Sequence, residues 1–183
     1  KLKGYSPVSF KNKPKPLFMT EFPANNTLYQ LLEDERKGNS FESWNDTKKL
    51  INIYGIASAM SYLHSMNIMH GDLNPRIIYL DEFLFPKIGF FIYSKDLKIS
   101  PENTIGNGVL TGTPICMAPE VINYKKVKLS DVFSFSIVVY MILLNQFPYD
   151  FPPSLSKLNN AVTSGIKPKI NKVIPECYKQ LME

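Results

Sequence analysis

The sequence predicts an α+β fold that is mainly helical and carries a small β element along one edge. Residues 47–65 repeat apolar side chains at three- and four-residue steps, and residues 131–144 are apolar nearly all round, so both stretches predict helices. Short β-branched pieces at 77–80 and 86–91 predict two strands of a hairpin around Asp81. A chain of 183 residues that is 44% hydrophobic and 20% charged has the composition of a folded domain.

Strands are expected near the beginning of the chain. Residues 11–16 alternate lysine and proline, which predicts a turn between two strands. The next residues, 17–22, are apolar and aromatic-rich between two prolines, which predicts a buried strand that ends abruptly. An Asn-Asn-Thr sequence at 25–27 offers a helix cap, so residues 28–36 are expected to form a short helix.

The helix predicted over 47–65 follows two capping candidates, Asn45 and Asp46. Its recurring side chains are expected to lie buried along one stripe of the helix. The members of this stripe are Leu50, Tyr54, Ala57, Met60 or Ser61, and His64.

The second half of the chain is predicted to contain a long irregular segment and three helices. Residues 92–117 carry Ser, Thr, Gly, Asn and Pro without periodicity, which is typical of a functional or mobile segment. The helix over 131–144 is expected to lie buried at the centre of the domain. Residues 154–164 and 175–182 predict two further helices joined by a proline-containing loop.

Charge and composition exclude several classes of function. The chain has 21 Lys and Arg against 16 Asp and Glu, but these basic residues are scattered, so no nucleic-acid partner is expected. The longest apolar stretch, 132–144, is shorter than the roughly 20 residues of a bilayer span, so no membrane partner is expected. Cys116 and Cys177 make neither a disulfide framework nor a metal cluster, and the first residues do not resemble a secretory signal. The expected location is therefore cytoplasmic.

The segment 69–81, Met-His-Gly-Asp-Leu-Asn-Pro-Arg-Ile-Ile-Tyr-Leu-Asp, resembles the catalytic loop of protein kinases. The pattern of that loop is H-R-D-L-K-P-x-N, followed by a short apolar strand and Asp. Further matches follow in the order of the family: PKIG, then GTPICMAPE, then SDVFSFSIVVYMILLNQFPY. Ahead of the loop, LFMTEFPANNTLYQLL resembles the strand, the hinge and the following helix. Together the matches cover nearly the whole chain, which is most similar to tyrosine-kinase-like serine/threonine kinases.

The resemblance implies a protein-kinase-like fold with a mainly helical large lobe at 25–183, incomplete at its C-terminal end. Residues 1–24 are expected to be a remnant of the small lobe and the hinge. The glycine-rich phosphate loop and the lysine strand of the family have no counterpart in this sequence. The helices that supply an arginine to the Ala-Pro-Glu glutamate also have none, so Glu120 is expected to be half-buried without an ion partner.

Three positions of the catalytic loop carry implications for chemistry. Asp72 occupies the position of the catalytic base, whose carboxylate accepts the proton of a substrate hydroxyl. Asn74 replaces the lysine that touches the transferring phosphate, which removes a positive charge from the site. Gly71 replaces the arginine that binds a phosphate group on the activation segment. Regulation by phosphorylation of that segment is therefore not expected.

Both metal-binding positions of the family are filled by apolar residues. Ile77 stands where the asparagine belongs, and its side chain has no lone pair to offer a cation. Aligning residues 86–89 with the strand before Asp-Phe-Gly places Phe90 at the metal-binding aspartate. A slipped register would recruit Asp96 instead, but it would lengthen a junction that otherwise aligns without gaps.

The same alignment assigns the inherited adenine pocket to Thr20, Glu21, Phe22, Pro23 and Tyr79. Thr20 is the gatekeeper, and Glu21 offers its backbone carbonyl to the adenine amino group. Pro23 stands where a backbone N–H donates to the ring, and proline has none. Tyr79 falls on the floor beneath the adenine, where its phenol either fills the space of the base or points out of the pocket.

His70 and Asp131 match two internal anchors of the family. The histidine is expected to pack into the hydrophobic spine, and the aspartate to accept backbone N–H groups of the catalytic loop. His64 lies on the long helix without other metal-ligating residues, and Thr113 matches the threonine of the substrate-docking loop.

The replacements predict a catalytically inactive or severely impaired kinase-like domain, a pseudokinase that serves as an interaction or allosteric module. No cofactor is then expected, and the partner is a protein. The alternative is an active serine/threonine protein kinase that uses Asp72 as base to transfer the γ-phosphate of ATP with Mg. A third alternative is a non-functional fragment without a stable fold.

Overall fold

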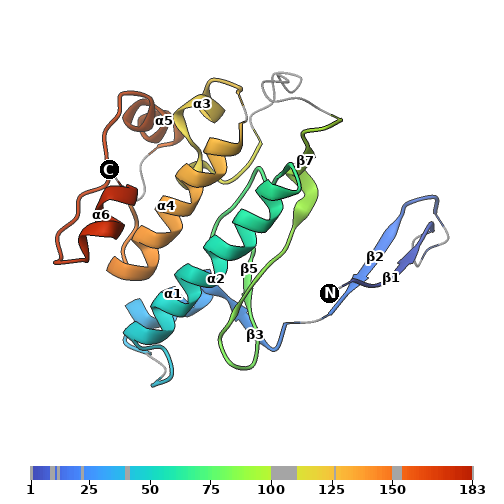
Figure 1. Ribbon diagram of the computed structural model, residues 1–183, viewed down its shortest axis with the longest axis horizontal. Helices are drawn as coiled ribbons and strands as arrows, with labels where there is room; N and C mark the ends of the chain where they lie inside the picture. The colour runs from blue at the N-terminus through green and yellow to red at the C-terminus, as the bar shows by residue number, and fades with distance from the viewer. Residues whose placement is uncertain are drawn as a thin grey trace.

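The computed structural model describes residues 2–8, 11, 13–21, 23–39, 42–99, 111–125, 127–149 and 154–182. These residues form the predicted α+β fold, with helices on one side and short antiparallel strands on the other (Figure 1). The strands are β1 (Leu2–Ser6), β2 (Leu17–Thr20), β3 (Asn25–Thr27), β4 (Ile68–Met69), β5 (Ile78–Leu80), β6 (Pro86–Ile88) and β7 (Lys95–Asp96). The helices are α1 (Leu28–Arg36), α2 (Asp46–Ser65), α3 (Pro119–Ile122), α4 (Lys128–Leu144), α5 (Leu155–Thr163) and α6 (Glu176–Met182).

The core lies around α4, which runs beside α2 (Figure 1). As predicted, α4 is buried almost all round, and the side chains of Val138 and Ile142 are completely inaccessible to solvent. Two of the serines of α4 lie within its apolar part, and the hydroxyls of both are hydrogen-bonded. The Ser134 hydroxyl donates to the Cys116 carbonyl at 2.7 Å, and the Ser136 hydroxyl donates to the Phe133 carbonyl at 2.8 Å. Helix α4 therefore lies at the centre of the fold, and α2, α6 and the segment around Cys116 pack on it.

The predicted hairpin is confirmed as β5 and β6, which pair antiparallel with Tyr79 opposite Lys87. Strand β3 adds to the other edge of β5 and completes a three-stranded sheet in the order β3-β5-β6. The turn is held by Asp81, whose Oδ1 accepts the backbone N–H groups of Phe83 and Phe85 at 3.0 and 2.9 Å. Helix α2 packs on this sheet through β6.

The predicted helix over 47–65 is confirmed as α2, but its predicted buried stripe is wrong in part. Leu50 is 42% exposed and Tyr54 is 76% exposed, whereas Met60 is buried as expected. The side chains that α2 buries are Asn52, Ile53, Ile56 and Met60. Apolar residues recur at helical spacing on two neighbouring stripes of this helix, and packing against α4 and β6 decides which stripe is covered.

The predicted strand over 17–22 forms as β2, but it is not buried. Within the described residues β2 pairs with β1 in a two-stranded sheet of its own, which projects away from the helices (Figure 1). Phe18 is 66% exposed, and its ring lies 5.3 Å from the ring of Tyr5 across the hairpin. The residues predicted to form a turn, 11–16, stand between these two strands in the chain, but residues 9, 10 and 12 of the connection lie outside the described residues. Apolar composition predicted burial here, but the other elements do not pack on this hairpin within the described chain.

The other predicted helices also form, as α1, α5 and α6. The irregular segment over 92–117 lies partly outside the described residues, at 100–110. Its described parts include β7 and a short 3-10 helix at Pro114–Cys116, and another 3-10 helix at Phe91–Tyr93 precedes β7. No helix within the described residues is long and apolar enough to cross a bilayer.

Candidate functional site

The catalytic-loop segment, which follows β4, is anchored by the buried carboxylate of Asp131 on α4. Asp131 is 2% exposed, its Oδ2 accepts the backbone N–H of His70 at 2.8 Å, and its Oδ1 accepts that of Gly71 at 2.9 Å. These bonds confirm the predicted anchoring by Asp131. The His64 Nε2 of α2 also lies 2.9 Å from Asp131 Oδ2. One carboxylate therefore ties α2, α4 and the catalytic-loop segment together.

His70 anchors the same segment from inside the core. Its side chain is completely buried, its Nε2 lies 3.1 Å from the Gly89 carbonyl oxygen, and its ring lies 5.1 Å from the ring of Phe91. This packing agrees with the expected place of the histidine in the hydrophobic interior. It brings the end of β6 against the catalytic-loop segment.

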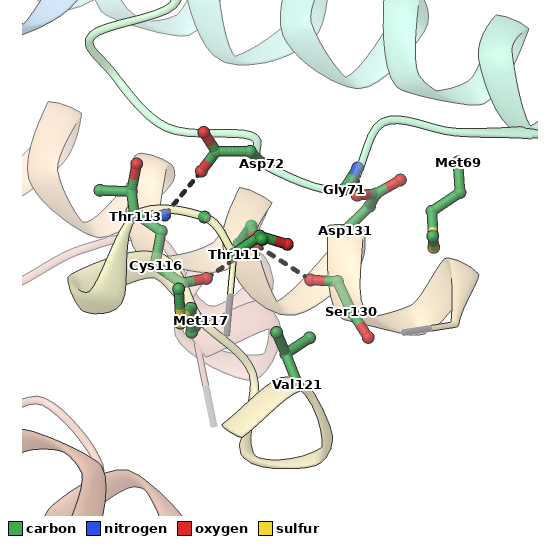
Figure 2. Close-up of a pocket in the computed structure, with 12 residues that line it drawn as sticks. Met69, Gly71, Asp72, Thr111, Thr113, Cys116, Met117, Val121, Ser130 and Asp131 are labelled. Carbon is green, nitrogen blue, oxygen red and sulfur yellow. Dashed lines mark hydrogen bonds between the residues drawn. The ribbon is translucent and has the colours of Figure 1, made fainter. Parts of the chain in front are cut away.

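Asp72 faces the segment that precedes α3. The backbone N–H of Thr113 donates to Asp72 Oδ1 at 2.7 Å, and Figure 2 shows the carboxylate pointing toward that nitrogen. Cys116 lies close by and is 2% exposed. Burial, and next the charge of Asp72, raise the pKa of the Cys116 thiol above its ordinary value. The thiol therefore stays protonated at neutral pH and is no candidate nucleophile.

Asn74 is buried and bonds only to the backbone of its own loop in the contacts we observe. Its Nδ2 donates to the Asp72 carbonyl at 2.9 Å, and its Oδ1 accepts the backbone N–H of Arg76 at 2.9 Å. The residue that replaces the family's lysine therefore closes a turn.

The two apolar residues that the resemblance assigns to metal-binding positions differ in their surroundings. Ile77 is 7% exposed and belongs to the hydrophobic core. Phe90 is 52% exposed and adopts a left-handed backbone with φ of 60°. Neither side chain has a donor atom for a cation, so the residues at these positions do not fit Mg²⁺. Asp96, the residue of the slipped alignment, lies in β7, and its Oδ1 accepts the backbone N–H of Lys98 at 2.9 Å.

Gly71, at the position of the family's arginine, has a backbone that disfavours any side chain. Its φ is +79°, and a Cβ atom there would lie 2.6 Å from the backbone oxygen of Tyr93. Both features select glycine. The local backbone at this position is therefore suited to glycine and not to a residue with a side chain.

The residues assigned to the adenine pocket lie on two different sheets and the connection between them. Thr20 is exposed at the end of β2, and Glu21 and Pro23 are half-buried after it. Phe22 lies outside the described residues. Glu21 reaches the second sheet, because its Oε1 lies 3.4 Å from Nζ of Lys87, the partner of Tyr79 across β5 and β6.

Tyr79 is half-buried, and its ring lies against Gly89. A Cβ atom on Gly89 would lie 3.0 Å from Tyr79 Cε2, which shows how closely the ring approaches that glycine. The Tyr79 ring therefore lies over Gly89, the residue just before Phe90.

Glu120 is half-buried, as expected, and its carboxylate has a neutral partner. The Ser130 hydroxyl of α4 donates to Glu120 Oε1 at 2.7 Å. No ion pair of Glu120 is seen within the described residues, in line with the expectation that its arginine partner is missing. A hydroxyl in the first turn of α4 satisfies one of its oxygens.

Two residues near the site were not found by the sequence analysis. His64 was noted only as a histidine without metal ligands, although it contacts Asp131. Arg76 was passed over, although its guanidinium carbon lies 3.6 Å from the centre of the Tyr29 ring. Each contact joins residues far apart in the chain, and the local pattern carries no signal for either.

Comparison with known proteins agrees with this geometry. The family model described as protein tyrosine and serine/threonine kinase matches residues 4–183. Serine/threonine-protein kinase STY46 of Arabidopsis thaliana is 31% identical over 93% of this chain and 28% of its own length. STY17 of the same plant is 29% identical over the same shares. The RGS domain-containing serine/threonine-protein kinase A of Dictyostelium discoideum is 30% identical over 91% of this chain and 15% of its own length.

The chain thus spans 28% or less of the length of these relatives. The match to the family nevertheless runs through almost every described element, from β1 to α6. It includes the anchored loop around His70 and Asp72 and the buried helix α4 that holds it. This chain belongs to the protein tyrosine and serine/threonine kinase family.

Proposed function

We propose that this chain is a kinase-like domain that does not transfer phosphate and that serves as an interaction or allosteric module. The observation that carries the proposal is the pair of apolar residues, Ile77 and Phe90, at both metal-ligand positions of the family. Phosphoryl transfer in kinases needs metal ions that neutralise the phosphates and bridge them to the protein. A domain that lacks both metal-binding side chains cannot hold these ions at those positions.

Two further replacements support the same proposal. Asn74 directs its amide to the loop backbone, so no cation stands where negative charge would develop on a phosphate. The positive φ at Gly71 and the close approach of the Tyr93 oxygen disfavour the arginine that would bind an activating phosphate. The residues that support architecture, His70 and Asp131, keep their contacts.

We also propose that the inherited adenine pocket of Thr20, Glu21, Phe22, Pro23 and Tyr79 no longer binds ATP. Pro23 has no backbone N–H to donate to the adenine ring. The phenol of Tyr79 lies against Gly89, and we propose that it takes part of the floor on which the base would lie. A cofactor is not required for an interaction module.

In this proposal residues 25–183 form the large lobe and residues 1–24 form the last part of the small lobe with the hinge. The partner is a protein, without nucleic acid or membrane, and the location is the cytoplasm. The chain spans 28% or less of the length of the relatives compared above. The proposal therefore concerns this domain and not the activity of a whole protein.

An active serine/threonine kinase is the second candidate, and one observation favours it. Asp72 keeps its carboxylate beside Thr113, the position of the substrate-docking threonine. The relatives are named serine/threonine-protein kinases. In this alternative Asp72 accepts the proton of the substrate hydroxyl, and ATP with Mg is required.

A thermal-shift titration with MgATP tests the proposal. If the dissociation constant were about 100 μM, 10 mM nucleotide would stabilise the fold by about 2.7 kcal/mol. We expect no shift of the melting temperature. A saturable shift with ATP that is not seen with equal concentrations of pyrophosphate would contradict the proposed loss of ATP binding.

A further inference from the structure

All of the net positive charge of the chain belongs to its first 20 residues. The whole chain has 21 Lys and Arg and 16 Asp and Glu. Residues 1–20 contain five lysines, at positions 1, 3, 11, 13 and 15, and no acidic residue, so residues 21–183 contain 16 basic and 16 acidic residues. The net charge of +5 is therefore localised on the segment that forms β1 and β2, which we call the basic hairpin (residues 1–20).

The basic hairpin stands apart from the rest of the described chain. Its two strands form a separate sheet that projects away from the helices (Figure 1). The side chains of Lys3, Lys11 and Lys15 are exposed, and no ion pair of these three is seen within the described residues. Glu21, the first acidic residue of the chain, is shared with Lys87 of β6 at 3.4 Å. One carboxylate at the base of the hairpin does not compensate five ammonium groups.

Three of the lysines lie in the connection between β1 and β2, where two prolines restrict the backbone. Pro14 and Pro16 alternate with Lys13 and Lys15, and the backbone N–H of Lys15 donates to the Lys13 carbonyl at 2.7 Å. Lysines on an exposed strand protect its edge from pairing with another chain, but Lys11, Lys13 and Lys15 lie outside both strands. A stiff connection that carries several cations lowers the entropic cost of binding a partner with several anions.

The hairpin also exposes two aromatic side chains, Tyr5 and Phe18. Their rings lie 5.3 Å apart and are tilted by 48°, so they do not present two parallel faces on which bases stack. All five cations are lysines, whereas arginine is the residue whose planar guanidinium binds a phosphate through two hydrogen bonds. The hairpin is therefore better suited to carboxylates flanked by apolar side chains than to the phosphates of a nucleic acid.

We infer that the basic hairpin binds an acidic segment of a partner protein. The ammonium groups of Lys11 and Lys15 pair with carboxylates of that segment, and the Tyr5–Phe18 pair contacts its apolar side chains. The inference rests on the proposed function and gives the interaction module a surface and a partner chemistry. Charge complementarity also makes a second copy of this chain a poor occupant, because two such hairpins repel each other and residues 21–183 carry no net charge.

Fluorescence anisotropy with matched peptides tests the inference on the full 183-residue chain. The probe is fluorescein-labelled Gly-Glu-Asp-Leu-Glu-Asp-Leu-Glu-Gly, and its control carries the corresponding amide in place of every carboxylate. We expect the acidic peptide to bind about tenfold more tightly at low salt. This preference should fall as salt is added, because pairs of exposed charges are screened.

Two double variants locate the charge that the acidic peptide recognises. Lys11→Gln with Lys15→Gln removes two cations of the hairpin and should reduce the preference about fivefold. The matched control is Lys98→Gln with Lys167→Gln, which removes the same charge at exposed positions outside the hairpin and should retain the preference. Because the two double variants have the same net charge, a difference between them reports the position of the charge.

The aromatic contact is tested separately with Phe18→Thr. Phe18 is exposed and threonine favours strands, so the hairpin should be retained. We expect this variant to weaken the binding of the acidic and the amide peptides by the same factor, about threefold or more. Hydrogen exchange of the β1 and β2 amides checks the hairpin. The lysine variants leave both rings in place, so they test the inference independently of this one.

Several outcomes overturn the inference: equal affinity for the two peptides, an equal loss of preference in the two double variants, or unchanged affinity in Phe18→Thr with the hairpin retained. Tighter binding of oligothymidine or of phosphatidylserine vesicles than of the acidic peptide, lost in the Lys11 and Lys15 double variant, assigns the hairpin to phosphates and also overturns it. Self-association in sedimentation that this variant removes assigns the hairpin to a second copy, with the same consequence.

These measurements are independent of catalysis, because the peptides contain no hydroxyl and no nucleotide is added. Phosphate transfer to a serine-containing version of the acidic peptide would contradict the proposed function alone. Loss of the preference for the acidic peptide would contradict this inference alone.

Discussion

His64 on α2 and Asp131 on α4 meet beneath the catalytic-loop segment, with 2.9 Å between Nε2 and Oδ2. The same Asp131 oxygen accepts the backbone N–H of His70, and the other oxygen accepts that of Gly71. A buried carboxylate with three donors is well compensated, whereas the donors would be left unsatisfied without it. This contact explains how a loop of few apolar residues is held in one position.

Replacing Asp131 should therefore destabilise the domain whether or not it is an enzyme. Asp131→Ala leaves two buried backbone N–H groups without an acceptor, and we expect a loss of about 1–3 kcal/mol in the free energy of unfolding. Urea denaturation followed by circular dichroism measures it. The control is Glu82→Ala, which removes an exposed carboxylate in the turn between β5 and β6. Equal midpoints for the two variants would argue against the anchoring role.

Restoring the family's arginine at Gly71 should destabilise the fold. A left-handed backbone disfavours side chains by about 1–2 kcal/mol, and a Cβ atom here would also lie 2.6 Å from the Tyr93 oxygen. We expect Gly71→Ala and Gly71→Arg each to cost about 3 kcal/mol or more in unfolding free energy.

Gly38 is the matched control for that prediction. Its φ is +84°, but a Cβ atom there would meet nothing within 4 Å. Gly38→Ala should therefore show the backbone strain alone, about 1–2 kcal/mol. If Gly71→Ala costs no more than Gly38→Ala in the same urea titration, the close approach to Tyr93 is not a constraint.

The raised pKa of Cys116 predicts a specific dependence of stability on pH. Burial, and then the charge of Asp72, favour the neutral thiol in the folded state, whereas the unfolded thiol ionises at about pH 8.5. This contribution is fully present below the pKa of the unfolded thiol and is lost as the pH rises above it. From pH 7.5 to 9.5 we expect unfolding free energy to fall by about 1 kcal/mol.

Cys116→Ala should remove this part of the pH dependence in urea titrations at the two pH values. Burial also raises the pKa of Tyr140 and of Tyr149, but tyrosines ionise only near pH 10 in the unfolded chain, above the range compared. An identical slope with pH in Cys116→Ala and the unchanged protein would contradict the assignment.

The two thiols should also differ in chemical reactivity. Cys177 is exposed and Cys116 is buried, so Ellman's reagent should modify the first in the native protein and the second only after unfolding. The count of released thiolate before and after adding urea measures this. Rapid release from both thiols in the native protein would show that the region around Cys116 opens readily.

Substitutions of Asp72 separate its structural contribution from chemistry. Asp72→Asn keeps an oxygen for the Thr113 N–H, so we expect unfolding free energy to change by less than about 0.5 kcal/mol. Asp72→Ala removes that acceptor and should cost about 1 kcal/mol. A general base contributes on the order of 10²–10⁴ in rate. If Asp72→Asn eliminated phosphate transfer to a protein substrate at unchanged stability, the domain would be an enzyme.

The sequence alone determined most of the elements and the positions at which the kinase pattern is broken. Helices α1, α2, α4, α5 and α6 and the β5–β6 hairpin were predicted, because periodicity, caps and turn residues are local signals. Ile77 and Phe90 were also identified from their places in a motif. Whether the inherited pocket of Thr20 to Pro23 and Tyr79 binds a nucleotide stays a prediction.

Only the tertiary structure decided which faces are covered and which distant residues meet. Tyr54 and Phe18 belong to apolar patterns that predicted burial. Both side chains are nevertheless exposed, because the elements that pack on their segments cover other faces. The contacts of Asp131 with His64 and of Arg76 with Tyr29 join residues 67 and 47 positions apart. Side-chain spacing along one element specifies a helix or a strand, whereas such contacts depend on how α1, α2 and α4 pack together. A single sequence contains no local signal for that packing.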